Sequence, residues 1–114
     1  MSDCIFCKLA NKEIPTDFLY EDENVVAFND LYPLTPVHVL VVPKKHYDNI
    51  IDGIPANTLE SVTKAIAAVT EQTGIKESGF RVITNTGKHG GQSINHVHFH
   101  VLGGRQLDDS MGEE

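Results

Sequence analysis

The chain has 114 residues, of which 40% are hydrophobic and 22% are charged, the usual balance of one globular domain. Its net charge of −7 argues against binding a nucleic acid polymer, because such binding depends on lysines and arginines that neutralise phosphates. No window has the apolar length of a membrane span, and the first residues lack the order of a secretory signal. We therefore expect a cytoplasmic protein without a membrane partner, for which a small anionic ligand remains open.

The first half of the chain predicts a short helix followed by three strands. Residues 4–11 carry three apolar side chains at helical spacing. The segments "DFLYEDE" and "NVVAFND" predict two strands joined by an acidic turn, and "HVLVVP", residues 38–43, predicts a third. The prolines of "PLTP" interrupt pairing, so that segment is expected to be a loop.

The second half predicts one long helix and two more strands. Pro55 suits the first turn of a helix over residues 55–74, and Gly74 suits the position just past its end. Its apolar stripe is formed by Leu59, Val62, Ile66 and Val69. Residues 79–86 and 96–102 alternate as strands do. The order predicts a single α+β domain, residues 1–114, with an antiparallel sheet of about five strands and an acidic tail, residues 107–114, that we expect to be mobile.

The segment "HVHFHVL" places His96, His98 and His100 at alternate positions. A strand would put all three on one face and their apolar neighbours on the other. The face would then be a solvated polar surface, a metal site, or a site for nucleophilic or acid–base chemistry. Because the outer two side chains would lie about 13 Å apart, all three cannot share one metal ion. Neutral imidazole is a competent nucleophile near pH 7, so we favour the chemical interpretation.

The loop before this segment, "GKHGGQS", is rich in glycine. Its backbone N–H groups are open to an anion, as in loops that cradle phosphate, although it lacks the ending of a Walker A loop. Alone, it would be read as a plain hairpin connection. Next to three alternating histidines, it favours a site where imidazole attacks phosphorus.

The segment "HVHFHVL" matches the pattern His-φ-His-φ-His-φ-φ and resembles the histidine triad (HIT) superfamily of nucleotide hydrolases and transferases. The resemblance covers nearly the whole chain, and "GGQS" and "GGRQ" beside the triad resemble its Hint branch, the purine nucleoside phosphoramidases. It implies the HIT fold and a covalent mechanism in which His98 attacks the α-phosphorus and water then hydrolyses the nucleotidyl-histidine. It further implies proton delivery to the leaving amine by Ser93 or a neighbouring imidazole. His38 would support the triad, with a sheet histidine bonded to backbone as the alternative.

The resemblance also implies the substrate contacts. Donors to the phosphoryl group would be His100, Gln92 and the backbone of Gly91, Gln92 and Ser93. Asp30 would accept both ribose hydroxyls, and Asn85 would contact phosphate or ribose, although both are also ordinary turn residues. The apolar base pocket would consist of Ile5, Phe6, Leu9, Phe28 and Leu31, which without the resemblance would be assigned to the core. An apolar pocket predicts a purine nucleotide ligand without strict choice between adenine and guanine.

The segment "CIFC" has the Cys-x-x-Cys spacing of a zinc half-site. By pattern match to HIT proteins that carry it, the ligands would be Cys4, Cys7, His46 and His96, a closed set that predicts structural zinc. The alternative is two ordinary thiols. A redox role would require a thioredoxin-like βαβ context, which is not seen.

Three other functions remain open from the sequence: a dinucleoside polyphosphate hydrolase, a nucleotide-binding module with little turnover, and a zinc protein without a nucleotide role. The resemblance implies a homodimer formed through the long helix and a sheet edge. It ends after Gln106, where the acidic tail leaves the choice of leaving group open.

Overall fold

The computed structural model describes residues 4–110 and contains the two helices and five strands that the sequence predicts. In chain order they are α1 (Ile5–Ala10), β1 (Tyr20–Glu21), β2 (Val25–Asn29), β3 (Val37–Pro43), α2 (Ala56–Gln72), β4 (Phe80–Ile83) and β5 (Phe99–Gly103). All neighbouring strands pair antiparallel in the order β1-β2-β3-β5-β4. No helix among residues 4–110 is long and apolar enough to cross a membrane.

The strand register gives the sheet two different faces. Val39 lies opposite Val101 and Ala27 lies opposite Val41, and these side chains belong to the core cluster that also contains Val62 of α2. Side chains of the other parity, such as Phe28 and Leu40, point to the opposite face, because successive residues of a strand alternate. The long helix therefore covers one face only.

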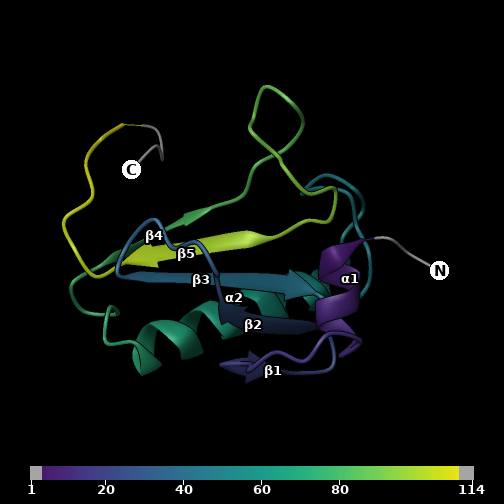
Figure 1. The fold of residues 1–114 in the computed structure, drawn as a ribbon, viewed down its shortest axis with the longest axis horizontal. Coiled ribbons are helices and arrows are strands. Elements are labelled where there is room, and N and C mark those ends of the chain that lie inside the picture. Colours follow the sequence, from purple (N-terminus) through teal and green to yellow (C-terminus); the bar gives the residue numbers. More distant parts are fainter. Residues whose placement is uncertain (1–3, 111–114) are drawn as a thin grey trace.

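The second face carries α1 at one end. A separate core cluster there consists of Phe6, Ala10, Val26, Phe28, Leu40 and Val42. Figure 1 shows α1 at the end of the sheet toward which β3 runs, and the long connection from β4 to β5 rises from the same end. This end therefore brings together α1, the glycine-rich loop and the start of the histidine segment.

The buried face of α2 differs from the predicted stripe. Leu59 is 39% exposed and Ile66 is only partly buried, whereas Ala65 is fully buried. The buried positions are Thr58, Ser61, Val62, Ala65, Val69 and Thr70. Small side chains therefore form most of the contact face, which allows the helix to approach the sheet closely. The prediction of the helix itself is confirmed, with Pro55 at the N-cap rather than in the first turn and Gly74 in the left-handed region at φ 78°.

The regular part of the last strand is shorter than predicted. β5 begins at Phe99, so His96, Val97 and His98 precede the strand ladder. Other contacts hold this stretch: the Val97 N–H donates to the Tyr47 carbonyl at 2.7 Å, and the Thr84 hydroxyl donates to the His98 carbonyl at 2.9 Å. Val97 still enters the α2-side core with Phe99 and Val101. The alternation therefore continues through the irregular part of the segment.

Candidate functional site

The three triad histidines face away from α2, as the alternation predicts. The rings of His98 and His100 lie 5.0 Å apart between centroids. Phe6 of α1 packs edge-on against His98 at 4.8 Å and against His96 at 6.1 Å. The face is less open than expected from the sequence, because His96 is fully buried and His98 is only 5% exposed. The cover is α1, whose Phe6 lies over both rings.

The hydrogen bonding of His98 fixes its tautomer. Its Nδ1 lies 2.8 Å from the carbonyl oxygen of His96, so Nδ1 carries the proton and donates it. In a neutral ring Nε2 then holds a free lone pair, and no hydrogen bond within residues 4–110 occupies it. Burial lowers the pKa of His98 below its ordinary value of 6.5. His98 is therefore a neutral imidazole with an available nucleophilic nitrogen.

A second hydrogen-bonded chain fixes the tautomer of His100. The Leu34 N–H donates to His38 Nδ1 at 3.1 Å, which places the His38 proton on Nε2. His38 Nε2 donates to His100 Nδ1 at 2.9 Å and lies 3.4 Å from a carboxylate oxygen of Asp30. His100 must therefore carry its own proton on Nε2. Burial, together with the neighbouring His98 and His38, lowers the pKa of His100 to about 4, so the ring stays neutral and acts as a donor.

Asp30 follows β2, and its carboxylate has the turn role that the sequence left open and also lies near His38. One carboxylate oxygen accepts the Tyr32 N–H at 2.8 Å, which is a turn role. The other lies near His38 Nε2 at 3.4 Å. Because an ionised carboxylate has about four acceptor sites, Asp30 keeps capacity for donors on a ligand.

The glycine-rich loop, residues 87–93, is braced by two side-chain amides. Asn85 Nδ2 donates to the Gly90 carbonyl at 2.7 Å. Gln92 Oε1 accepts the Gly87 N–H at 2.9 Å, and Gln92 Nε2 donates to the carbonyls of Asp48 (2.6 Å) and Ile94 (3.0 Å). The amide protons of Gln92 are thus already used, so the structure does not favour the expected donation from this side chain to a phosphoryl group.

Glycine is needed within the loop for steric reasons. A Cβ atom added to Gly90 would lie 2.3 Å from the Thr86 carbonyl oxygen, and Gly91 has φ 81°. The Gly91 and Gln92 N–H groups donate to the carbonyls of Lys88 (3.1 Å) and Gly87 (3.0 Å), so the Ser93 N–H is the backbone donor of residues 91–93 that remains available. Ser93 is exposed, and its hydroxyl makes no hydrogen bond within the described residues, to His98 or to any other group.

The five residues expected to form the base pocket divide into two groups. Phe6 and Phe28 belong to the core cluster beneath α1 and are 5% and 4% exposed, so the structure gives them a packing role. Ile5 is 42% exposed, Leu31 is 87% exposed and Leu9 is half-buried. Only these last three present substantial apolar surface to a ligand.

The two cysteines and two histidines of the expected metal site lie together. Their four ligand atoms are all within 4.8 Å of one another. His96 Nδ1 is 3.2 Å from Cys4 Sγ and 3.3 Å from Cys7 Sγ, and His46 Nδ1 is 3.3 Å from Cys7 Sγ. Two sulfurs and two imidazole nitrogens at such separations suit a small tetrahedral ion.

The ring nitrogens of His96 and His46 that point away from the sulfurs form hydrogen bonds, as they do in metal-binding histidines. His96 Nε2 donates to the Pro43 carbonyl at 2.8 Å, and His46 Nε2 donates to the Asp48 carboxylate at 2.9 Å. These bonds leave the Nδ1 lone pairs facing the sulfurs, and partners of this kind typically orient metal ligands. Burial lowers the pKa of His96 to about 4, which keeps it in the neutral form that a metal requires.

Several residues of the site carried no recognised signal in the sequence. Asp48 lies two residues after His46, and a carboxylate so close to a candidate ligand was a usable signal. Leu34 and Pro43 act through backbone atoms, which the identity of the side chain does not reveal. Thr84 holds the His98 carbonyl through its hydroxyl, and only the strand register identifies that contact.

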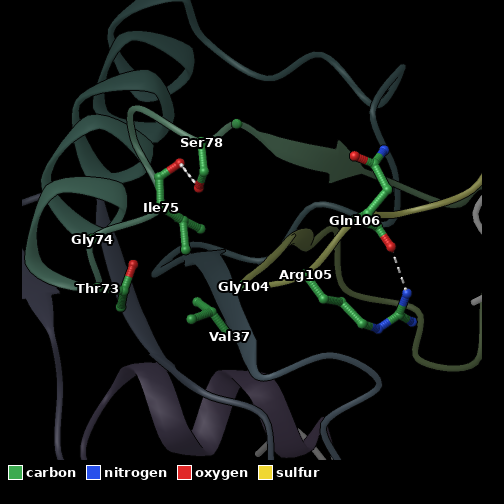
Figure 2. Close-up of a pocket in the computed structure, with 9 residues that line it drawn as sticks. Val37, Thr73, Gly74, Ile75, Ser78, Gly104, Arg105 and Gln106 are labelled. Carbon is green, nitrogen blue, oxygen red and sulfur yellow. Dashed lines mark hydrogen bonds between the residues drawn. The ribbon is translucent and has the colours of Figure 1, made fainter.

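A cavity of about 430 Å³ lies elsewhere, where the end of α2 meets the residues after β5. Figure 2 shows Arg105 and Gln106 on one side of it and Ile75 and Ser78 on the other. Its lining contains no histidine, cysteine or carboxylate. The candidate site is therefore the buried histidine face, and not this cavity.

Comparison with known proteins agrees with the geometry. The sequence model of the HIT domain matches residues 11–107. The chain is 41% identical to a purine nucleoside phosphoramidase of Escherichia coli, with 98% of this chain and 96% of that protein covered. A HIT family hydrolase from Clostridium thermocellum superposes with a TM-score of 0.90 at 41% identity, covering 97% of this chain and 98% of that one.

A histidine triad protein from Clostridium difficile superposes with a TM-score of 0.85 at 49% identity, covering 96% of this chain and 97% of that one. The family match spans most of the sequence. The structure has a five-stranded antiparallel sheet and brings the rings of His98 and His100 side by side. The chain therefore belongs to the HIT domain family, together with HIT family hydrolases of known structure.

Proposed function

We propose that this protein hydrolyses purine nucleoside 5′-phosphoramidates through a nucleotidyl intermediate on His98. The observation that carries the proposal is the free Nε2 lone pair of a neutral His98, whose ring lies 5.0 Å from the ring of His100 between centroids. The similarity of this chain to a purine nucleoside phosphoramidase of Escherichia coli supports the substrate class. The ligand implied is a purine nucleoside monophosphate group.

In the first step the His98 Nε2 lone pair attacks the α-phosphorus and the bond from phosphorus to the amine breaks. His100 Nε2–H and the backbone N–H of Ser93 donate to the phosphoryl oxygens as charge develops on them, whereas the N–H groups of Gly91 and Gln92 donate to carbonyls within the loop. The departing amine takes up a proton, which Ser93 can relay from solvent, while neutral His100 keeps its own proton because losing it would leave an imidazolate anion. Because a phosphorus–nitrogen bond replaces another, the intermediate need not lie far above the substrate in free energy.

In the second step water attacks the phosphorus and releases a proton to solvent, which balances the proton taken up by the amine, and His98 leaves as the neutral ring that began the cycle. The bond from His98 Nδ1 to the His96 carbonyl keeps the same tautomer throughout, so Nε2 is again free. Asp30 accepts the ribose hydroxyls in this proposal, and Ile5, Leu9 and Leu31 supply the exposed apolar surface for the base. Asn85 contributes to the phosphate site by holding the loop at Gly90.

Replacing the nucleophile tests the mechanism directly. We expect His98→Ala to lower the rate of adenosine 5′-phosphoramidate hydrolysis by about a thousandfold or more, because the covalent route is lost. Mass spectrometry of wild type quenched during turnover should show a nucleotidyl adduct on the peptide that contains His98. An adduct on another residue, or full activity in the variant, would contradict the proposal.

The pH dependence follows from the burial of His98. Burial lowers its pKa below 6.5, so the ring stays neutral as the pH falls to that value and is protonated only below it. We therefore expect kcat/KM to hold level from pH 8 to about 6.5 and to fall at lower pH. In Phe6→Ala, which uncovers the ring, the fall should begin at higher pH. A wild-type decline that starts above 6.5 would be inconsistent with a buried nucleophile.

We further propose that Cys4, Cys7, His46 and His96 hold a structural zinc ion. The support is the clustering of their four ligand atoms and the outer hydrogen bonds of both imidazoles. When bound, zinc would tie α1 to the histidine segment and would leave no ligand position open for substrate. It therefore takes no part in the chemistry at phosphorus.

Metal analysis of purified variants tests this assignment. We expect about one zinc per chain in wild type and in His98→Ala, and a large loss in Cys4→Ala and Cys7→Ala, which remove thiolate ligands. The same variants should unfold at a lower temperature, because metal binding stabilises the folded state. Equal zinc content in all four proteins would refute the ligand set.

A homodimer is the third part of the proposal. β4 forms an edge of the sheet, and its Phe80 and Val82 are 40% and 41% exposed. Within residues 4–110 no strand pairs with the outer side of β4, and an unpaired edge with exposed apolar side chains invites pairing with a second copy. The cytoplasmic location expected from the sequence stays a prediction.

Sedimentation of wild type and Val82→Asp tests the dimer. We expect wild type to sediment as a dimer at micromolar concentration, and Val82→Asp to weaken association by tenfold or more because it places a charge on the paired edge. A monomeric wild type, or a dimer unaffected by the substitution, would argue for another arrangement.

A further inference from the structure

Three consecutive residues, 46–48, each contact a different part of the site. His46 Nδ1 lies 3.3 Å from Cys7 Sγ in the cysteine–histidine cluster. The Tyr47 carbonyl accepts the Val97 N–H, between two triad histidines, at 2.7 Å. The Asp48 carbonyl accepts Gln92 Nε2 at 2.6 Å. This short segment therefore joins the metal cluster, the triad and the glycine-rich loop.

Gln92 links this segment to the glycine-rich loop through both the nitrogen and the oxygen of its side-chain amide. Its Nε2 is bound to Asp48 and also to the Ile94 carbonyl, and its Oε1 accepts the N–H of Gly87, where the loop begins. The position of Gly87 thus depends on the position of the Asp48 carbonyl. The amide is fully committed to this link.

Asp48 is itself held on two other sides. Its carboxylate accepts His46 Nε2–H at 2.9 Å, and its backbone N–H donates to the Asp52 carboxylate at 2.8 Å. Because these two hydrogen bonds restrain Asp48, a rotation of the His46 ring would displace the whole Asp48 residue. Metal binding at His46 Nδ1 would fix that ring, and with it the anchor point of Gln92.

We propose that Gln92 is a positioning residue that couples the cysteine–histidine metal site to the glycine-rich loop. A bound zinc ion then strengthens binding of a phosphoryl group in the loop, and the phosphoryl group strengthens zinc binding by the same factor, since such coupling is reciprocal. The inference rests on the proposed function and on the proposed metal site. It assigns Gln92 a role through the loop backbone in place of direct contact with phosphate.

The first test measures binding without turnover, with AMP as the probe. The dissociation constant of AMP is measured by calorimetry with zinc bound and after removal of zinc by a chelator, and zinc affinity is measured by chelator competition with and without AMP. In wild type we expect zinc to strengthen AMP binding by about fivefold or more, and AMP to strengthen zinc binding equally.

Two variants isolate the link. Gln92→Met keeps the length of the side chain but removes every amide hydrogen bond, and it should reduce the coupling factor to near one while zinc still binds. His89→Ala changes an exposed side chain of the same loop and should keep the wild-type factor. A factor in Gln92→Met equal to that of wild type, or the absence of zinc binding in wild type, would overturn the inference.

Hydrogen exchange at the Gly87 amide provides a readout that needs no nucleotide. Zinc removal should speed its exchange in wild type, because the bond to Gln92 Oε1 is loosened. Gln92→Glu keeps that acceptor but cannot donate to Asp48, so its Gly87 amide should lose the dependence on zinc. Exchange in wild type that is indifferent to zinc would refute the coupling. None of these measurements uses hydrolysis, so they remain decisive if the protein proves inactive on phosphoramidates.

Discussion

The hydrogen bond from His98 Nδ1 to the carbonyl of His96 is the interaction on which the candidate site depends. It places the His98 proton on the inner nitrogen and leaves the lone pair on the outer one. The bond forms because the segment continues to alternate through His96 and His98, before the regular strand begins. The Thr84 hydroxyl and the Tyr47 carbonyl hold this irregular stretch where the ladder does not. A local backbone conformation thus determines which nitrogen can attack.

Burial makes the same site chemically usable. Phe6 lies over His96 and His98, and burial lowers the pKa of both rings and keeps them neutral. At His96 the neighbouring His46 and His98 act in the same direction. A neutral His98 is a nucleophile, and a neutral His100 is a hydrogen-bond donor. The short helix that supplies Phe6 has Cys4 as its N-cap and contains Cys7, so the cluster that anchors α1 also holds Phe6 over the nucleophile.

Alternation and turn residues predict most of this fold from the sequence. The five strands, both helices and the opposite facing of the histidines and their apolar neighbours follow from periods of two and 3.6 residues. The buried face of α2 was predicted less well, because Ala65 packs closely while the larger Leu59 stays outside. Gln92 was assigned to phosphate from the resemblance alone, yet its amide binds Asp48, a residue 44 positions away. Contacts between distant backbone atoms leave no pattern in a single sequence.

The tautomer of His98 is the most direct test of this account. Two-dimensional correlation spectroscopy of protein labelled with nitrogen-15 distinguishes a protonated ring nitrogen from one with a free lone pair, and it can be recorded at pH 7 without substrate. The account predicts that His98 carries its proton on Nδ1 and that Nε2 is unprotonated. A His98 protonated on Nε2, or charged at that pH, would leave no nucleophilic nitrogen facing the site and would contradict the proposed chemistry.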